Sequence, residues 1–302
     1  MVRIAAARPE IYDLIDPRAE LRQLASGFVF TEGPVWDAVT GSWLFNDIRN
    51  DSGWRWREET GAELVARPNF IANGMVYDRA GDLLVCEHVT STVVRVKRNG
   101  DRQIVAYHYQ GRYLNSPNDV VTRSDGTIYF TDPDYGRWDH AVGVHRRREL
   151  DFLGLFSVSP TGELRLAAPP DTFDQPNGLC FSPDERELYV DDRHGVYAFP
   201  VAPDGALGAR REVRTDLSSP AGEENGDPDG MKCDADGNLW CTGRGGVWVL
   251  RPSGELLGVI ETPEIVANLA WGGPDWRTLF LCTSTTVHAL RTRVPSAKLP
   301  YH

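Results

Sequence analysis

The sequence NGMVYDRAGDLLVCEHVTSTVVRVKRNG, residues 73–100, contains one copy of a unit that recurs along the chain. The unit opens with a polar residue, Asn73, before a short apolar run. A turn at Asp78–Gly81 leads into a second apolar run, and a third run follows after His88. Short apolar runs separated by glycine-containing turns are typical of consecutive antiparallel strands.

Five further units share this pattern of a carboxylate or carboxamide side chain, a short strand, a turn and a second strand. The leading residues of the six units are Glu32, Asn73, Asn118, Asn177, Asp229 and Asn268. Their spacings are 41, 45, 59, 52 and 39 residues. Six units of three or four strands at this period predict an all-β fold, a six-bladed β-propeller whose first strands line a central channel.

The rest of the chain is interpreted around these units. Residues 1–20 are predicted to form an N-terminal arm with one helical turn, and residues 21–302 a single propeller domain. The segment Leu21–Phe30 is predicted to pair into the last unit, which closes the ring and removes an open sheet edge. The longest spacing is explained by an insertion at residues 134–153, which is interpreted as a solvated loop or as a lid over the channel mouth.

Composition limits the class of partner. The chain has 302 residues, 41% hydrophobic and 25% charged, with a net charge of −11. An acidic surface repels phosphate backbones, so we expect no nucleic-acid partner. No apolar stretch approaches the ~18 residues of a membrane span, and no signal-peptide pattern is visible, so we expect no membrane partner and a cytoplasmic location. The oligomeric state stays open.

The cysteines indicate a reducing compartment. Five are present, an odd number, and each lies in a strand-like run: Cys86, Cys180, Cys233, Cys241 and Cys282. We interpret them as buried free thiols. A hairpin disulfide between Cys233 and Cys241, which flank one turn, is the less favoured alternative because cross-strand geometry seldom suits it.

The six leading residues occupy one position of the repeat, and equivalent positions of a propeller lie on one ring around its axis. We therefore expect them to converge at one mouth of the channel. Confined oxygen groups, two of them carboxylates, are costly when unpaired, and a hard divalent cation would pair them. Oxygen donors favour Ca²⁺, with Mg²⁺, Mn²⁺ and Zn²⁺ as alternatives, although the ring lacks the His and Cys of a dedicated zinc site. Taken singly, most of these residues could equally be turn or capping residues.

Several motifs together resemble a known family. They are Thr31-Glu-Gly-Pro-Val-Trp36, Asn115-Ser-Pro-Asn-Asp119, Tyr129-Phe-Thr-Asp-Pro133, Gln175-Pro-Asn-Gly-Leu179, Phe181-Ser-Pro-Asp184 and Pro228-Asp-Gly-Met231. They resemble the family of gluconolactonase, senescence marker protein and luciferin-regenerating enzyme, and Leu84-Val-Cys-Glu-His88 resembles a motif of its bacterial gluconolactonase-like branch. The resemblance spans roughly residues 22–292. It implies a six-bladed propeller, a divalent metal, usually Ca²⁺, on the channel axis, and hydrolysis of sugar lactones.

The resemblance also implies roles for individual residues. By motif, Glu32, Asn177 and Asp229 would be metal ligands, and Asn118 a further ligand or a substrate contact. Ser116 stands where some animal members have an Arg, so the sugar contact of that Arg is absent and the substrate stays open. As a hypothesis, the metal polarises the lactone carbonyl and Asp229 is the general base that accepts a proton from water.

Further candidates surround the ring. His88 ends the second strand of its unit and is a candidate substrate contact or proton shuttle. Together with Asp229 and Asn118, it completes the set of candidate catalytic residues. Asn73 and Asn268 are expected to contact substrate. Tyr135 and Trp138, on the insertion, are candidates for an apolar wall of the site. The sequence contains no Gly-x-Ser-x-Gly elbow, His-Glu-x-x-His helix or phosphate-binding loop, which disfavours serine-hydrolase chemistry.

The sequence therefore predicts a metal-dependent lactonase that acts on a small sugar lactone. One alternative is a hydrolase of another ester, lactone or phosphotriester. A second alternative, from a different class, is a non-catalytic propeller in which the metal is a structural plug and the bound partner is a metabolite or a protein. Removal of the metal with a chelator distinguishes the enzyme from the non-catalytic propeller. An enzyme would lose turnover with its fold intact, whereas a propeller with a structural metal would lose stability.

Overall fold

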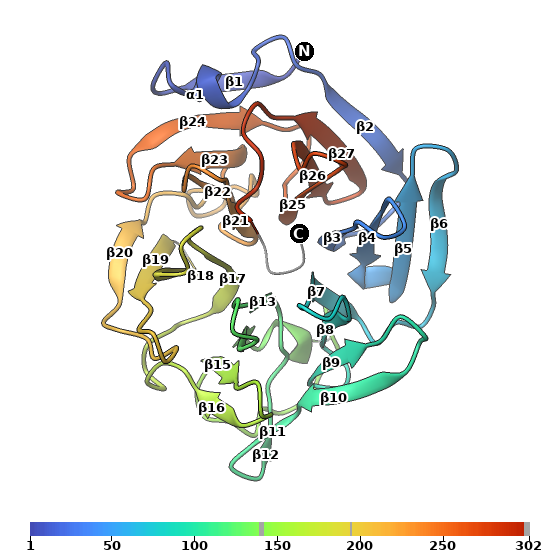
Figure 1. Cartoon of the computed structure of the whole chain (residues 1–302), viewed down its shortest axis with the longest axis vertical. Helices are drawn as coiled ribbons and strands as arrows, with labels where there is room; N and C mark the ends of the chain where they lie inside the picture. The colour runs from blue at the N-terminus through green and yellow to red at the C-terminus, as the bar shows by residue number, and fades with distance from the viewer. Residues whose placement is uncertain (139–141, 194, 299–302) are drawn as a thin grey trace.

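The computed structural model describes residues 1–138, 142–193 and 195–298. In this part of the chain, six antiparallel sheets surround a central axis as the blades of a propeller (Figure 1). The predicted all-β, six-bladed architecture is therefore confirmed. The first strand of each blade lies nearest the axis, and later strands lie progressively farther out.

The strands follow the repeat along the chain. In the first three blades, from the axis outward, they are β3 (Thr31–Asp37), β4 (Ser42–Asp47), β5 (Ser52–Arg57) and β6 (Gly61–Ala66); β7 (Ala72–Tyr77), β8 (Leu83–Glu87), β9 (Thr92–Val96) and β10 (Arg102–Ala106); and β13 (Val120–Thr122), β14 (Ile128–Asp132), β15 (Gly154–Val158) and β16 (Leu164–Leu166). In the last three they are β17 (Pro176–Phe181), β18 (Glu187–Asp192), β19 (Gly195–Pro200) and β20 (Arg211–Arg214); β21 (Met231–Cys233), β22 (Leu239–Gly243), β23 (Gly246–Leu250) and β24 (Leu256–Glu261); and β25 (Asn268–Gly272), β26 (Thr278–Thr283) and β27 (Thr286–Arg291).

The remaining elements are short. They are β1 (Arg3–Ala6), α1 (Ile11–Leu14), β2 (Leu21–Ser26), the hairpin of β11 (His108–Tyr109) and β12 (Arg112–Tyr113), and two 3₁₀ turns at Ile48–Asn50 and Tyr135–Arg137. Among the described residues, no helix has the length and apolar sequence that would be needed to cross a membrane.

The ring is closed by the N-terminal part of the chain. Strand β2 pairs antiparallel with β27, with Leu21 opposite Leu290 and Ser26 opposite Thr286, so it is the outermost strand of the sixth blade. This confirms the pairing predicted for the segment that begins at Leu21. Because β2 covers the edge of β27, the last blade has four strands although its own repeat supplies three.

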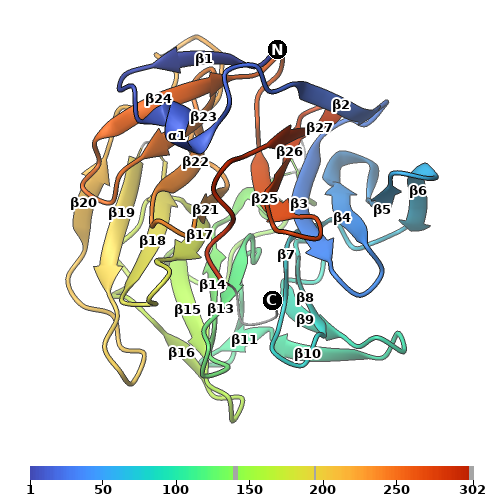
Figure 2. The same ribbon diagram turned by 45° about the horizontal axis from the view of Figure 1, so that its top comes forward.

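The first 20 residues pack onto the fifth blade rather than projecting from the propeller. Strand β1 adds to β24 as a fifth strand, with Arg3 opposite Glu261, and it lies along the outside of that blade in both views (Figures 1 and 2). The expected helical turn is α1. Its Ile11 and the following Ile15 are fully buried in a cluster with Trp240 of the fifth blade.

The inner strands are buried on both faces because each blade is covered by two neighbours. This explains why second strands such as Leu239–Gly243 have no polar-apolar alternation, since every residue of β22 is buried. The seam between the first and sixth blades is filled with aromatic rings. Trp43 of β4 stacks on Phe280 of β26 with ring centroids 4.7 Å apart, and burying such a side chain contributes about 1.5–3 kcal/mol.

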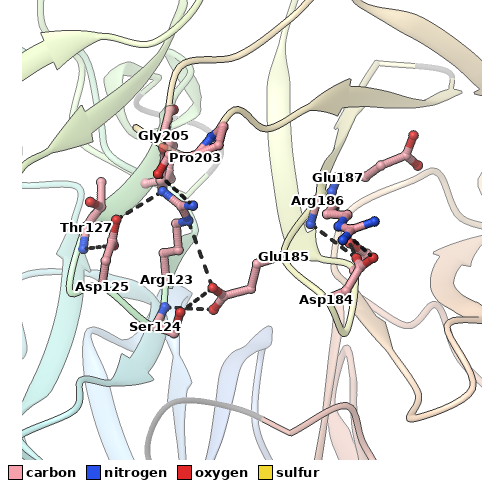
Figure 3. A network of polar contacts seen from close by, with 12 residues as sticks. Arg123, Ser124, Asp125, Thr127, Asp184, Glu185, Arg186, Glu187, Pro203 and Gly205 are labelled. Carbon is pink, nitrogen blue, oxygen red and sulfur yellow. Dashed lines mark hydrogen bonds and ion pairs between the residues drawn. The ribbon is translucent and has the colours of Figure 1, made fainter.

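Polar contacts between turns join the third and fourth blades (Figure 3). Glu185, in the β17–β18 turn, accepts a hydrogen bond from the backbone N–H of Ser124 at 2.7 Å. Arg123 donates to the carbonyl oxygen of Pro203 at 3.1 Å and to Asp125 at 3.0 Å. The contacts to Glu185 and Pro203 cross from the β13–β14 turn to two turns of the next blade, so they fix the blades relative to each other away from the axis.

Glycines next to the leading residues allow neighbouring blades to meet at the axis. A Cβ atom at Gly74 would lie 2.6 Å from the carbonyl oxygen of Asn118 in the next blade. A Cβ at Gly33 would likewise overlap the carbonyl of Asn73, and one at Gly178 would overlap the carbonyl of Asp229. The Asn-Gly pairs at 73 and 177 therefore lie within strands and are not hairpin turns. They leave room for the backbone of the adjacent blade.

The five cysteines are buried and free, as expected. Cys233 lies opposite Leu239, whereas Cys241 lies opposite Met231, so the two thiols flanking this turn do not face each other. The thiol nearest to Cys233 is that of Cys180 in the fourth blade, with 3.8 Å between the sulfur atoms. These thiols therefore fill space between blades.

Replacing Gly178 by Ala tests the close approach between blades. The added methyl group overlaps the backbone of Asp229, so we expect Gly178→Ala to lower the free energy of unfolding by about 3 kcal/mol or more. Gly53→Ala is the matched control, because its Cβ would meet its nearest atom at 3.4 Å in ordinary contact. Urea unfolding measures both, and equal stability of the two variants would contradict the constraint.

Candidate functional site

Five of the six leading residues line one cavity at a mouth of the channel. The cavity has a volume of about 370 Å³. The leading residues on its wall are Glu32, Asn73, Asn118, Asn177 and Asp229. Each lies at or just before the start of an inner strand, so the shared repeat position brings together side chains that are up to 197 residues apart in the sequence.

The sixth leading residue, Asn268, does not line this cavity. It is 4% exposed, and its side-chain Nδ2 donates to Oε2 of Glu32 at 3.0 Å. Its own Oδ1 accepts the backbone N–H of Leu269 at 2.8 Å. Asn268 is therefore placed to hold the Glu32 carboxylate, and the direct substrate contact expected of it has no opening here.

Carboxylates crowd the floor of the cavity. Burial and the charge of Asp119 raise the pKa of Glu32 to about 7. Burial, with the charges of Glu32 and Asp119, raises the pKa of Asp229 well above its ordinary value, while a hydrogen bond from Asn177 acts in the opposite direction. Three acidic groups therefore repel one another in a desolvated space.

Sequence reasoning missed one member of this acidic group, Asp119, and the cation beside it, Lys232. Asp119 is 4% exposed, and its Oδ2 has no hydrogen-bond partner among the described residues. The nearest cation is Lys232, whose Nζ lies 4.0 Å from that oxygen. The sequence signal that could have indicated Asp119 is its position directly after Asn118 in the Ser-Pro-Asn-Asp motif. The motif alone does not show which of these two side chains contributes to the site.

His88 lies behind Asn73 rather than on the cavity wall. It is 0% exposed, with Nδ1 2.8 Å from the carbonyl oxygen of Val142 and Nε2 3.3 Å from Nδ2 of Asn73. Burial and the nearby Arg146 charge lower the pKa of His88 to about 4, so the ring is neutral at neutral pH. Asn73 itself is buried, and its Oδ1 has no partner among the described residues.

The insertion supplies a wall of the cavity. Tyr135 and Val142 line it, while Trp138 packs edge-on against Tyr135 with ring centroids 5.5 Å apart and does not line it. Residues 139–141 of the expected lid lie outside the described residues. The insertion connects β14 to β15 of the third blade, and its first described element is the 3₁₀ turn at Tyr135–Arg137.

Two arginines of the insertion bind backbone oxygens of the neighbouring loops. Arg137, 6% exposed, donates from Nε to the carbonyl of Asn115 at 2.6 Å and from Nη2 to the hydroxyl of Ser91 at 3.1 Å. Arg146 donates to the carbonyl of His88 at 2.5 Å and to the same Ser91 hydroxyl at 3.2 Å. The basic run of the insertion therefore contains structural contacts as well as solvated charges.

The remaining walls differ in character. One side is apolar, with Phe30, Ile48, Ile265 and Val266. Another part of the wall is the acidic loop that leads to Asp229, with Glu223, Glu224 and Asp227. Neither Lys nor Arg is among the described residues that line the cavity. Sequence reasoning missed this loop, although its acidic run, Glu223-Glu-Asn-Gly-Asp227, was visible.

The donors on the cavity floor suit a hard cation. Glu32, Asn118, Asn177 and Asp229 offer carboxylate and carboxamide oxygens, which are the ligands that Ca²⁺ prefers. Among the described residues, no group of three or more His, Cys, Asp or Glu side chains has a metal-binding arrangement. Two of these four donors are Asn amides, and the two carboxylates lie close to Oδ2 of Asp119, which has no hydrogen-bond partner among the described residues, so the concentration of acidic oxygen fits a positive ligand.

Comparison with known proteins adds a family match. The family model for the SMP-30/Gluconolactonase/LRE-like region matches residues 30–285. The gluconolactonase of Zymomonas mobilis is 29% identical over 311 residues, covering 96% of this chain and 86% of that protein. The pentonolactonase XacC of Haloferax volcanii is 30% identical over 260 residues, covering 84% and 81%. A solved gluconolactonase structure from Xanthomonas campestris has a TM-score of 0.86 at 30% identity, covering 96% of this chain and 94% of that chain.

The family match extends over most of the chain. Residues 30–285 include strands of all six blades, from β3 to β26. The match therefore also includes the five leading residues on the cavity wall. The resemblance carried by the sequence motifs is confirmed, and the chain belongs to the SMP-30/Gluconolactonase/LRE-like family.

Proposed function

We propose that the protein hydrolyses a small sugar lactone in this cavity, in a reaction that depends on a divalent cation. The observation that carries the proposal is the convergence of Glu32, Asn118, Asn177 and Asp229 on one cavity of about 370 Å³. This volume is suited to a small molecule. The gluconolactonase and pentonolactonase relatives, each matching more than four fifths of this chain, support the choice of a lactone.

These four residues would hold the cation. Ca²⁺ is the expected ion, and Mg²⁺, Mn²⁺ and Zn²⁺ are the alternatives for the add-back experiment below. When bound, a divalent cation supplies Lewis-acid polarisation of the lactone carbonyl. Asn268 keeps the Glu32 carboxylate in place through its Nδ2 hydrogen bond.

Asp229 is the proposed general base. Its carboxylate takes a proton from a water molecule as the water oxygen forms a bond to the carbonyl carbon. The ring C–O bond then breaks, and the proton passes to the departing alkoxide, which gives the open hydroxy acid. Asn118 lines the same wall and is proposed either as a ligand or as a contact to the substrate.

The cavity wall offers both apolar and acidic groups to a sugar lactone. The apolar residues and the Tyr135 ring are suited to the carbon face of the substrate. Carboxylates of Glu223, Glu224 and Asp227 accept hydrogen bonds only, so they suit its hydroxyl groups. No cation on the described wall would pair with a phosphate or sulfonate substituent, so a neutral lactone is expected.

Chelation followed by metal add-back tests the proposal. We expect proton release from glucono-δ-lactone or a pentonolactone to fall to the uncatalysed rate with a chelator and to return with Ca²⁺, because chelation would remove the Lewis acid that polarises the lactone carbonyl. Circular dichroism should show that the fold persists. Unchanged turnover in chelator would contradict metal dependence. A large drop in Tm on chelation, with no turnover of any lactone, would instead support a structural plug.

The Asp229→Asn variant tests the general base. Removing the base is expected to lower kcat about 10²- to 10⁴-fold, measured with excess metal so that a weakened site is still filled. Asp236→Asn, an exposed turn residue of the same blade, is the matched control and should retain full turnover. Full turnover of Asp229→Asn with metal bound would show that the base assignment is wrong.

A further inference from the structure

The orientation of the Asn73 carboxamide is decided by the groups around His88. The carbonyl oxygen of Val142 can only accept, so Nδ1 of His88 must carry the proton of their 2.8 Å hydrogen bond. In the neutral imidazole, Nε2 is then an acceptor. The carboxamide nitrogen of Asn73 lies 3.3 Å from it and donates to it. The opposite orientation would place the Asn73 oxygen against a lone pair.

The remaining atom of this carboxamide is its oxygen. Oδ1 of Asn73 is buried and has no hydrogen-bond partner among the described residues, although Asn73 lines the cavity. A buried, unpaired carbonyl oxygen costs about 1–3 kcal/mol. A ligand that donates a hydrogen bond at this point would remove that cost. Because one N–H of the carboxamide is engaged by His88, the Asn73 group that is buried without a partner among the described residues is its acceptor oxygen.

The insertion keeps the imidazole in this position. Val142 belongs to the insertion, and Arg146 donates to the backbone carbonyl of His88 at 2.5 Å. Gly136 packs on the ring so closely that a Cβ there would lie 2.7 Å from Cγ of His88. The backbone N–H of Gly136 in turn donates to the Ser116 hydroxyl at 3.0 Å. The ring is therefore confined by the insertion on one side and by Asn73 on the other.

We propose that His88 is a positioning residue that fixes Asn73 as a hydrogen-bond acceptor for a hydroxyl group of the substrate. The proposal rests on the proposed lactonase function and adds a recognition element to it. It assigns His88 no contact with the substrate and no proton transfer. It also gives the insertion a role, since its contacts hold His88 in the required tautomer. A lactone that lacks hydroxyl groups would gain nothing from this arrangement.

Two variants of His88 separate its two hydrogen bonds. Asn at this position is short and retains a donor near the place of Nδ1, so His88→Asn keeps the contact to Val142 and loses the acceptor for Asn73. Gln is longer and places an oxygen near Nε2, so His88→Gln keeps the acceptor. We expect His88→Asn to raise KM for glucono-δ-lactone about tenfold with kcat little changed. His88→Gln should restore KM to near the wild-type value.

The control substrate is δ-valerolactone, which has the same ring and no hydroxyl groups. Its kcat/KM should be the same in the wild-type protein and both variants. Equal losses on both lactones, or equal losses in both variants, would mean that His88 only supports the fold and would overturn the proposal. A fall in Ca²⁺ affinity of His88→Asn, measured with the metal alone, would assign the Asn73 oxygen to the cation and would also overturn it.

The arrangement can be measured without any activity. Long-range ¹H–¹⁵N correlation of the histidine rings distinguishes the two tautomers, and His88→Asn identifies the signal of His88 among the seven histidines. We expect the Nδ1–H tautomer at pH 7, and an Nε2–H or doubly protonated ring would overturn the proposal. If the wild-type protein hydrolyses neither lactone, the lactonase proposal fails. Binding of 1,5-anhydroglucitol, an unreactive cyclic polyol, then decides by itself whether His88→Asn weakens hydroxyl recognition.

Discussion

The close approach of neighbouring blades at glycine is the constraint on which the site depends. At Gly33, Gly74 and Gly178, the backbone of the next blade occupies the space where a side chain would begin. Each of these glycines directly follows a leading polar residue. The same contact that closes the ring at the axis therefore places the polar side chains on one wall, and the cavity follows from the packing of the blades.

The electrostatic character of the site follows from this convergence. Glu32, Asp119 and Asp229 are brought together in a desolvated space, with Lys232 4.0 Å from Asp119 as a nearby cation. Burial and mutual repulsion disfavour their charged forms. Some buried carboxylates elsewhere in the molecule do have an arginine partner, as Asp37 has with Arg98 at 2.7 Å. A cation at the axis would complete the charge balance that the protein leaves open.

Around the cavity floor, hydrogen bonds from residues outside the cavity fix the orientation of the residues that line it. Asn268 secures Glu32, and His88 orients Asn73, while neither supporting residue lines the cavity. The insertion supports the second of these pairs through Val142 and Arg146. Orientation of the cavity residues Glu32 and Asn73 therefore depends on two side chains, Asn268 and His88, that do not line the cavity.

The sequence by itself determined the fold and the approximate composition of the site. Six copies of a polar residue, a short strand, a turn and a second strand predicted six blades. The shared position of the polar residue in each copy predicted that these side chains converge, because a residue's place in the repeat fixes its height along the axis. The same pattern selected the five leading residues on the cavity wall. The strand-like segment that begins at Leu21, together with the short last repeat, predicted the closing strand, and the pairing of β2 with β27 confirms it.

The tertiary structure alone decided which side chains face the ligand. Asn268 shares the repeat position of the others, yet its side chain turns to Glu32, which is 236 residues away in the sequence. His88 ends its strand near the mouth, but Asn73 lies between it and the cavity. Asp119 belongs to the acidic group only because the fold brings it close to Glu32 and Asp229, which lie in other blades. A repeat specifies position along a strand, whereas side-chain direction depends on hydrogen-bond partners and packing from distant blades, which no local pattern contains.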